Sequence, residues 1–293
     1  MKLTSSLFGN EPMSSMEVTD SRMLDPSDLE AAYARLKNWF ADCSGAIVAF
    51  SGGVDSSLVA FLGRRFLGKG DVLAVISASP SLKLSDLDAG KAFCANNDLS
   101  LRVIRTEELL NSDYSSNPSN RCYFCKSTLY EKLDPLLREF PQSWILNGTN
   151  LDDLGDYRPG LEAASEHQVR SPLAECGIGK EMVRALSRSF ELECWDKPAS
   201  PCLSSRIPYG QQVTEEKLRR IEGAEAWLVK LGFPVCRVRH VEDAACVEVP
   251  QERIGELPSL NTIQAEMRRL GFVEAFVDPE GFVTGKLNRA INE

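Results

Sequence analysis

The stretch of residues 46–57, AIVAFSGGVDSS, decides the fold of this chain. Its first five residues are apolar and predict a buried strand, and the run 56–62 predicts a helix. The Gly52-Gly53 turn between them lets the backbone approach an oxyanion closely, and the free amides at the helix N-terminus then face that oxyanion. Neighbouring serine hydroxyls add donors, and Asp55 is well placed to bind an accompanying Mg²⁺. The stretch therefore predicts an anion-binding turn at the end of a central strand.

Two common nucleotide-binding motifs, Gly-x-x-x-x-Gly-Lys-[Ser/Thr] and Gly-x-Gly-x-x-Gly, do not occur in the sequence. A tight glycine turn capped by serines is the alternative interpretation of SGGVDSS. The motif resembles the pyrophosphate loop (PP-loop) of the ATP pyrophosphatases, which holds the β- and γ-phosphates while a substrate oxygen attacks the α-phosphorus. The resemblance implies ATP and Mg²⁺ as cofactors, adenylation of a substrate and release of pyrophosphate. It implies ATP-binding roles for Ser51, Gly52, Gly53, Asp55, Ser56 and Ser57.

The composition is that of a globular protein with an acidic balance. The chain has 293 residues, 43% hydrophobic and 26% charged, and a net charge of −9. The negative charge argues against broad nucleic-acid binding, and no apolar run approaches the roughly 18–20 residues of a membrane span. Residues 1–24 lack the apolar stretch of a signal peptide and predict a disordered tail. The odd number of cysteines, nine, then fits a reducing compartment, so we expect a cytoplasmic protein.

Alternating strands and helices predict an α/β fold with a parallel sheet. Apolar runs at 72–76, 101–104 and 143–146 follow the first strand, with helical stretches between them. This alternation argues for a sheet covered on both faces, and ligands of such sheets bind at the carboxyl ends of the strands. We predict an adenine nucleotide alpha hydrolase-like (PP-loop) domain over residues 25–213.

The sequence changes in character over residues 214–293. A capped helix is followed by two alternating runs, 236–239 and 245–249, that predict strands. A second helix near 259–270 then leads to a strand over 272–277. We predict a compact C-terminal α+β domain that serves substrate binding or oligomerisation.

Three cysteines stand apart from the other six. Cys122 and Cys125 have the Cys-x-x-Cys spacing that lets two thiols bind one metal ion or one edge of a cluster. Cys202 lies in the proline-rich stretch 197–210, where Arg206 is expected to lower the pKa of a nearby thiol. A lone Cys-x-x-Cys is weak evidence for a metal site, and the alternative is packing. We expect packing roles for Cys43, Cys94, Cys176, Cys194, Cys236 and Cys246.

The chain has only two histidines, His167 and His240, which leaves little for a mixed zinc site or a histidine relay. We expect each of them at the surface or in a hairpin.

Further motifs make the resemblance to a known family specific. The chain carries NGTNLDDLGDYRPG at 147–160, KPASPCLSSRIPYG at 197–210, RVRH at 237–240 and EGFVTGKLN at 280–288. Together with SGGVDSS, these motifs resemble those of the LarE family. Its members are ATP-dependent sulfur transferases that help to build the nickel-pincer nucleotide cofactor of lactate racemase. The likeness covers nearly everything after the N-terminal tail.

The resemblance implies a two-step reaction on a small molecule. The enzyme adenylates a carboxylate of pyridinium-3,5-biscarboxylic acid mononucleotide, and sulfur then replaces AMP to leave a thiocarboxylate. Family members with one cysteine at the Cys202 position sacrifice its sulfur and are left with dehydroalanine. Members with three, matching Cys122, Cys125 and Cys202, hold a [4Fe-4S] cluster whose fourth iron can carry an extra sulfide.

The three-cysteine pattern of this chain implies the cluster-bearing type, with catalytic Cys202, Cys122 and Cys125 as its ligands. Sulfide or a sulfur donor is then the second substrate. The resemblance also implies a homo-oligomer, because family members form hexamers.

Arginines are the candidates for binding the substrate phosphate. Arg237 and Arg239 are two residues apart on a predicted strand, so both guanidiniums share one face and suit a phosphate. Arg206 is the third candidate. Solvated arginines on an edge strand are the alternative interpretation.

Two other functions stay open. Some tRNA thiolation enzymes also join a PP-loop to three cysteines and a cluster. The acidic balance weakens this alternative, since residues 214–293 carry eleven Lys/Arg against fourteen Asp/Glu. A non-catalytic adenine-nucleotide sensor would share the fold, but Asp55 and the cysteines argue against it. We expect a small-molecule enzyme that binds neither nucleic acid nor membrane.

Overall fold

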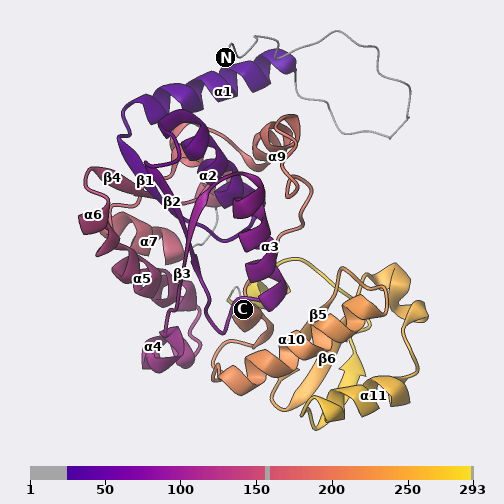
Figure 1. Cartoon of the computed structure of the whole chain (residues 1–293). Helices are drawn as coiled ribbons and strands as arrows, with labels where there is room; N and C mark the ends of the chain where they lie inside the picture. The colour runs from indigo at the N-terminus through magenta and orange to yellow at the C-terminus, as the bar shows by residue number, and fades with distance from the viewer. Residues whose placement is uncertain (1–24, 156–158, 292–293) are drawn as a thin grey trace.

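The computed structural model describes residues 25–155 and 159–291 (Figure 1). The predicted disordered tail 1–24 and the Asp-Tyr-Arg part of DYRPG, 156–158, lie outside the described residues. A four-stranded parallel sheet with the order β3-β2-β1-β4 confirms the predicted α/β fold. Its strands are β1 (Gly45–Ala49), β2 (Val72–Ser77), β3 (Ser100–Ile104) and β4 (Ser143–Leu146).

Helices cover both faces of this sheet, which is why the central strands β1 and β2 are apolar runs. Ala46 and Val48 of β1 face a core shared with α1 (Pro26–Ala41), α2 (Val54–Leu67), α3 (Leu84–Asn96), α8 (Pro172–Glu175) and α9 (Lys180–Ser189). Ile47 and Ala49 face the opposite core, with α5 (Arg121–Leu133), α6 (Leu136–Glu139) and α7 (Pro159–Glu166). Alternate residues of one strand therefore serve two separate cores.

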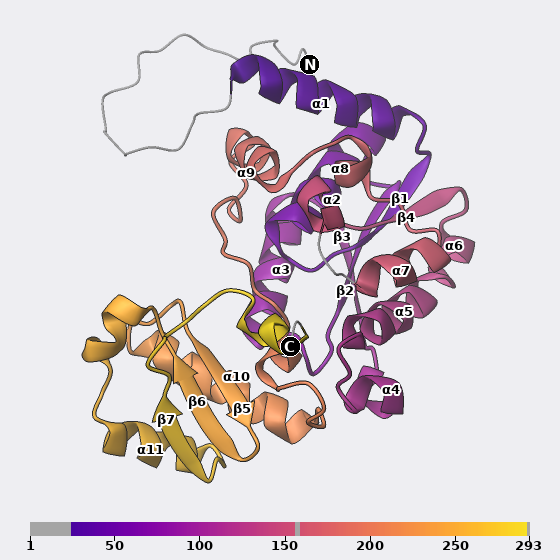
Figure 2. The same cartoon turned by 180° about the vertical axis from the view of Figure 1, so that it is seen from behind.

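A smaller mixed sheet follows, with the order β5-β6-β7 (Figure 2). Strands β5 (Arg237–Val241) and β6 (Ala244–Glu248) form an antiparallel hairpin, and β7 (Glu274–Val277) pairs with β6 in parallel. Helices α10 (Glu215–Lys230) and α11 (Leu260–Arg269) share one core with this sheet. Thr214 caps α10 by accepting a hydrogen bond from the Lys217 amide at 3.2 Å.

The two parts of the chain meet where α10 reaches the start of α3. Glu225 of α10 is buried and accepts from Arg206 at 2.9 Å, and its other oxygen lies 2.6 Å from the Lys83 ammonium. Burial alone would raise the pKa of Glu225, but Arg206 and Lys83 together hold it below its ordinary value. Glu222 accepts from the Leu84 amide at 2.6 Å. These contacts therefore hold α10, and with it the second sheet, against the start of α3.

Short 3₁₀ helices and turns occupy the stretches that connect these elements. Helices η1 (Glu108–Leu110) and α4 (Ser112–Ser115) interrupt one long connection, and η3 (Leu203–Arg206) interrupts another. The remaining elements are η2 (Leu151–Gly155), η4 (Gln251–Glu256) and η5 (Lys286–Ile291). Within the described ranges, no helix combines the length and the apolar character needed to cross a bilayer.

The structure confirms the prediction for one histidine. His240 lies in the β5–β6 hairpin, and its side chain is fully buried there against Phe272. Burial, reinforced by the nearby Lys217 ammonium, lowers its pKa below the ordinary 6.5.

Candidate active site

The SGGVDSS turn forms a tight loop at the carboxyl end of β1. Helix α2 begins at Val54, two residues earlier than the sequence predicts. The Ser51 amide donates to the Ser56 hydroxyl at 3.1 Å, and the two hydroxyls are 3.0 Å apart. The Ser56 hydroxyl also donates to the Gly53 carbonyl at 3.2 Å. Ser57 lies in the first turn of α2 and is fully buried beside Cys194.

Asp55 connects the loop to two other segments. Its carboxylate accepts from the Asn150 amide at 3.1 Å and lies 2.5 Å from the Lys180 ammonium. Gly148 lies so close to the loop that a Cβ atom there would be 2.5 Å from the Ser56 amide nitrogen. Only glycine permits this approach. The NGTN motif therefore packs directly on the PP-loop.

Two lysines beside this loop were missed by the sequence analysis. Lys180 opens α9 and reaches Asp55 across 125 positions of the chain. Lys197 donates to the Gly52 carbonyl at 3.1 Å and pairs with Asp86 at 3.0 Å. For Lys180, the only local signal in the sequence was the Gly179-Lys180 pair at the start of a helix. Such a pair is too common to indicate a phosphate site. Both ammonium groups add positive charge where phosphates are expected.

A cavity of about 930 Å³ opens at this edge of the sheet. It is at the upper end of the range for small-molecule sites, roughly 300–1,000 Å³. Residues of five segments are among those that line it: Ser51, Asp55 and Ser56 of the PP-loop, Asn147, Gly148 and Thr149 of NGTN, Ser119, Cys122 and Lys126 near the start of α5, Pro201 and Tyr209 of the Cys202 segment, and Gly285 near the C-terminus.

The two cysteine-bearing segments lie side by side at the same place. Cys122 and Cys125 are one turn apart at the start of α5, and Cys202 precedes η3. The buried Asn117 amide joins the segments, since it donates to the carbonyls of Ile207, Pro208 and Gln211 at 3.2, 2.7 and 3.0 Å. Arg121 donates to the Asn117 side chain and, at 3.1 Å, to the Ser204 carbonyl.

Cys202 and Cys122 lie close enough to Cys125 to affect the protonation of its thiol. Burial, followed by the charge of Cys202, raises the pKa of Cys125 far above its ordinary value. Tyr130 contributes most to the raised pKa of Lys126, and Cys125, Cys122 and Cys202 add to it against the opposing effect of burial. Among the described residues, none of these three cysteines forms a disulfide. The segments thus bring three thiols and a lysine together.

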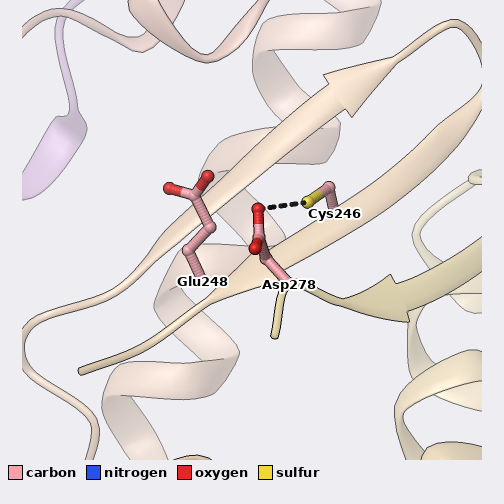
Figure 3. A group of neighbouring side chains, drawn as sticks. All are labelled: Cys246, Glu248 and Asp278. Carbon is pink, nitrogen blue, oxygen red and sulfur yellow. Dashed lines mark hydrogen bonds between the residues drawn. The ribbon is translucent and has the colours of Figure 1, made fainter. Parts of the chain in front are cut away.

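The donor set and spacing of these thiols bear on what they could hold. Among the described residues, one group of at least three His, Cys, Asp or Glu side chains has all its ligand atoms within 4.8 Å of one another, and it consists of Cys246, Glu248 and Asp278 (Figure 3). The three sulfurs of Cys122, Cys125 and Cys202 therefore do not all lie within 4.8 Å of one another. A cluster binds each cysteine to a different iron, so it does not require such close sulfurs. Three thiols on two segments that hydrogen bonds hold together are compatible with such a cluster.

The Cys246 group is already neutralised by the protein. Glu248 accepts from Arg239 at 2.6 and 3.1 Å, and Asp278 lies 2.5 Å from the Lys286 ammonium. Arg239 and Lys286 balance the charges of the two carboxylates, so little negative charge remains to attract a metal ion.

The three candidate arginines differ in their partners. Arg206 is buried, and its guanidinium donates to Glu225, Ser205 and the carbonyls of Pro201 and Cys202. These hydrogen bonds hold the Cys202 segment in place.

Arg239 is bound to Glu248 by two hydrogen bonds. Arg237 has no carboxylate partner among the residues that the structure describes. Its guanidinium donates to the Cys236 carbonyl at 2.7 Å and to the Ala199 carbonyl at 3.4 Å, and it stacks over Phe282 at 5.0 Å. Arg237 is thus the candidate with charge left for a phosphate.

The chain is similar to known proteins over most of its length. A family model described as NAD synthase matches residues 33–121. The chain is 33% identical over 253 residues to pyridinium-3,5-bisthiocarboxylic acid mononucleotide synthase of Lactiplantibacillus plantarum, covering 86% of this chain and 92% of that protein. It is 42% identical over 268 residues to an uncharacterized protein of Synechocystis, covering 90% of this chain and all of that protein. The chain therefore belongs to the LarE family, that of the pyridinium-3,5-bisthiocarboxylic acid mononucleotide synthases.

Proposed function

We propose that this protein uses ATP to convert the two carboxylates of pyridinium-3,5-biscarboxylic acid mononucleotide to thiocarboxylates. One observation carries the proposal. A single cavity is lined by the PP-loop on one side and by Cys122 and Pro201, the neighbour of Cys202, on the other. Such a cavity suits an enzyme that activates a carboxylate and replaces its oxygen without releasing the adenylate.

The first step is adenylation. A substrate carboxylate oxygen attacks the α-phosphorus of ATP, and the bond to the bridging oxygen breaks to release pyrophosphate. The amides of the PP-loop and the start of α2 face the departing phosphates. Mg²⁺ would bind at Asp55, and Lys180 at 2.5 Å from that carboxylate would share the phosphate charge.

The second step forms the thiocarboxylate. A sulfide attacks the acyl carbon of the adenylate, and the carbon–oxygen bond to AMP breaks. Cys122, Cys125 and Cys202 would hold a [4Fe-4S] cluster, which supplies an iron position for the sulfide. Lys126 lines the cavity beside Cys122, so its ammonium would offset the negative charge of the thiolates and of the leaving AMP.

The substrate phosphate is assigned to Arg237 in this proposal. Arg239 and Arg206 are engaged by Glu248 and Glu225, so they shape the region around it. A charge-assisted contact to a phosphate is worth roughly 1.5–3 kcal/mol, or about 10- to 150-fold in affinity.

Pyrophosphate release tests the proposal directly. Wild-type protein with ATP, Mg²⁺ and the pyridinium mononucleotide should release pyrophosphate, and substitution of tRNA for the mononucleotide should not support release. Asp55→Asn should abolish it while the protein stays folded. Asp98→Asn is the matched control, because Asp98 is an exposed acid paired with Arg64 and Lys69. Release at the wild-type rate in Asp55→Asn would refute the assignment of the loop.

Mass spectrometry separates the two sulfur sources. Cys202 should be unchanged after turnover if the sulfur comes from outside the protein. Conversion of Cys202 to dehydroalanine would mean that the cysteine itself is consumed, which is the alternative mechanism.

A further inference from the structure

We propose that residues 281–286, here called the strap, form a wall of the mononucleotide pocket and position Arg237 for the substrate phosphate. This inference rests on the proposed function and deepens it. The strap is the central part of the EGFVTGKLN motif, to which no role has been assigned so far. Figure 2 shows the chain returning after β7 toward the first sheet, where the C-terminus lies.

The first end of the strap is fixed by close backbone packing. Gly281 has a φ of +72°, and a Cβ atom there would lie 2.6 Å from the Val249 carbonyl oxygen and 3.0 Å from the Gln251 Cα. Any other residue would collide with this backbone. The Phe282 amide donates to the same Val249 carbonyl at 2.8 Å. The start of the strap is therefore held against the residues that follow β6.

The other end is fixed by a buried ammonium. Lys286 lies 2.5 Å from Asp278, 3.1 Å from Glu280 and 3.5 Å from Glu248, and only 18% of its side chain is exposed. Glu248 in turn holds Arg239. The two anchors, Gly281 and Lys286, have four residues between them, so the backbone there has little freedom.

The fixed segment connects the cavity to Arg237. Gly285 lines the cavity together with Pro201 and Tyr209. The Phe282 ring stacks with the Arg237 guanidinium at 5.0 Å, and that guanidinium donates to the Ala199 carbonyl at 3.4 Å. Arg237 is thus held between the strap and the Cys202 segment.

This placement determines how the mononucleotide is oriented in the cavity. The phosphate end lies toward the strap and Arg237, and the carboxylates lie toward the PP-loop and Cys122. Residues of the strap then act as positioning residues, because they set the orientation of Arg237 and the shape of the wall. They take no part in bond making.

Phe282→Leu removes the ring and keeps an apolar side chain. It should raise KM for the mononucleotide by roughly 2- to 30-fold, the range that a cation–π contact supports, with kcat and ATP affinity unchanged. Phe276→Leu is the matched control, because Phe276 lies on the same sheet in β7, is 42% exposed and makes no contact with Arg237 in the described structure. An equal KM in the wild type and in Phe282→Leu would overturn the role of the strap.

Hydrogen exchange of the wild type gives a second readout that needs no variant. The amides of residues 283–285 should exchange more slowly when the mononucleotide is bound and should not respond to ATP alone. Mononucleotide binding without this protection would overturn the inference and leave the proposed function standing. Failure of the wild type to bind the mononucleotide at all would instead overturn the proposed function.

Discussion

Lys180 is the residue whose role depends most on the folded structure. Its ammonium lies against Asp55, which itself faces the phosphate loop. Lys180→Gln should lower kcat/KM for ATP by roughly 10- to 150-fold, because one charge-assisted contact to a phosphate is lost. Steady-state pyrophosphate release at varied ATP measures this. Lys91→Gln, at an exposed pair with Asp88, should behave as the wild type. A normal kcat/KM in Lys180→Gln would place the phosphates away from α9.

His240 should make the stability of the protein depend on pH. Burial and Lys217 lower its pKa in the folded state, so the unfolded chain binds the proton more readily. The stability contributed by the neutral ring is present above pH 6.5, the ordinary pKa, and is lost as the pH falls toward the lower folded value. Urea unfolding at pH 8 and pH 5.5 measures the difference.

His240→Phe should reduce that difference, whereas His167→Gln should keep it. His167 is only partly buried and pairs with Asp134. An identical loss of stability between pH 8 and 5.5 in the wild type and His240→Phe would show that other groups cause it.

At the scale of elements, Asn117 joins the two cysteine-bearing segments. Its amide donates to three carbonyls of the Cys202 segment, and its backbone has a φ of +62°. Asn117→Ala should lower the free energy of unfolding by roughly 1–3 kcal/mol, since buried carbonyls lose their donor. Chemical denaturation measures it. Gln142→Ala is the control, because Gln142 also has a positive φ, of +69°, but is exposed. An equal loss in both variants would mean that backbone strain, not the amide, is responsible.

The positions of the main strands could be predicted well from the sequence. The contacts between charged side chains of different elements could not. The runs around β1 and β2 are apolar because both faces of the sheet are buried there, so simple hydropathy identified them. The partners of Arg206 depend on Glu225, which lies on a helix that the local sequence does not relate to it. Lys180 was missed for the same reason. Charged side chains are placed by tertiary contacts, and these leave no periodic pattern.

At the scale of the whole molecule, the cysteine site requires both parts of the chain to be docked. Cys122 and Cys125 lie on α5, which covers the first sheet, and Cys125 also packs against the core of the second. Cys202 belongs to a segment that Arg206 ties to Glu225 of α10. Lys83 binds the same Glu225 from the start of α3. The position of Cys202 relative to the other two thiols is therefore set by the contact between the two parts.

Anaerobic reconstitution with iron and sulfide should load one cluster per chain, seen as visible absorption and as bound iron and sulfide. Cys122→Ser, Cys125→Ser and Cys202→Ser should each lose most of the iron, because each removes one of three ligands from a cluster that the protein binds at only three of its irons. Cys176→Ser is the matched control, since Cys176 is partly exposed but lies beside Arg35, against α1 and away from the cavity lining. Full iron content in Cys202→Ser would show that the contact between the two parts does not complete the site, and that Cys122 and Cys125 bind iron with other ligands.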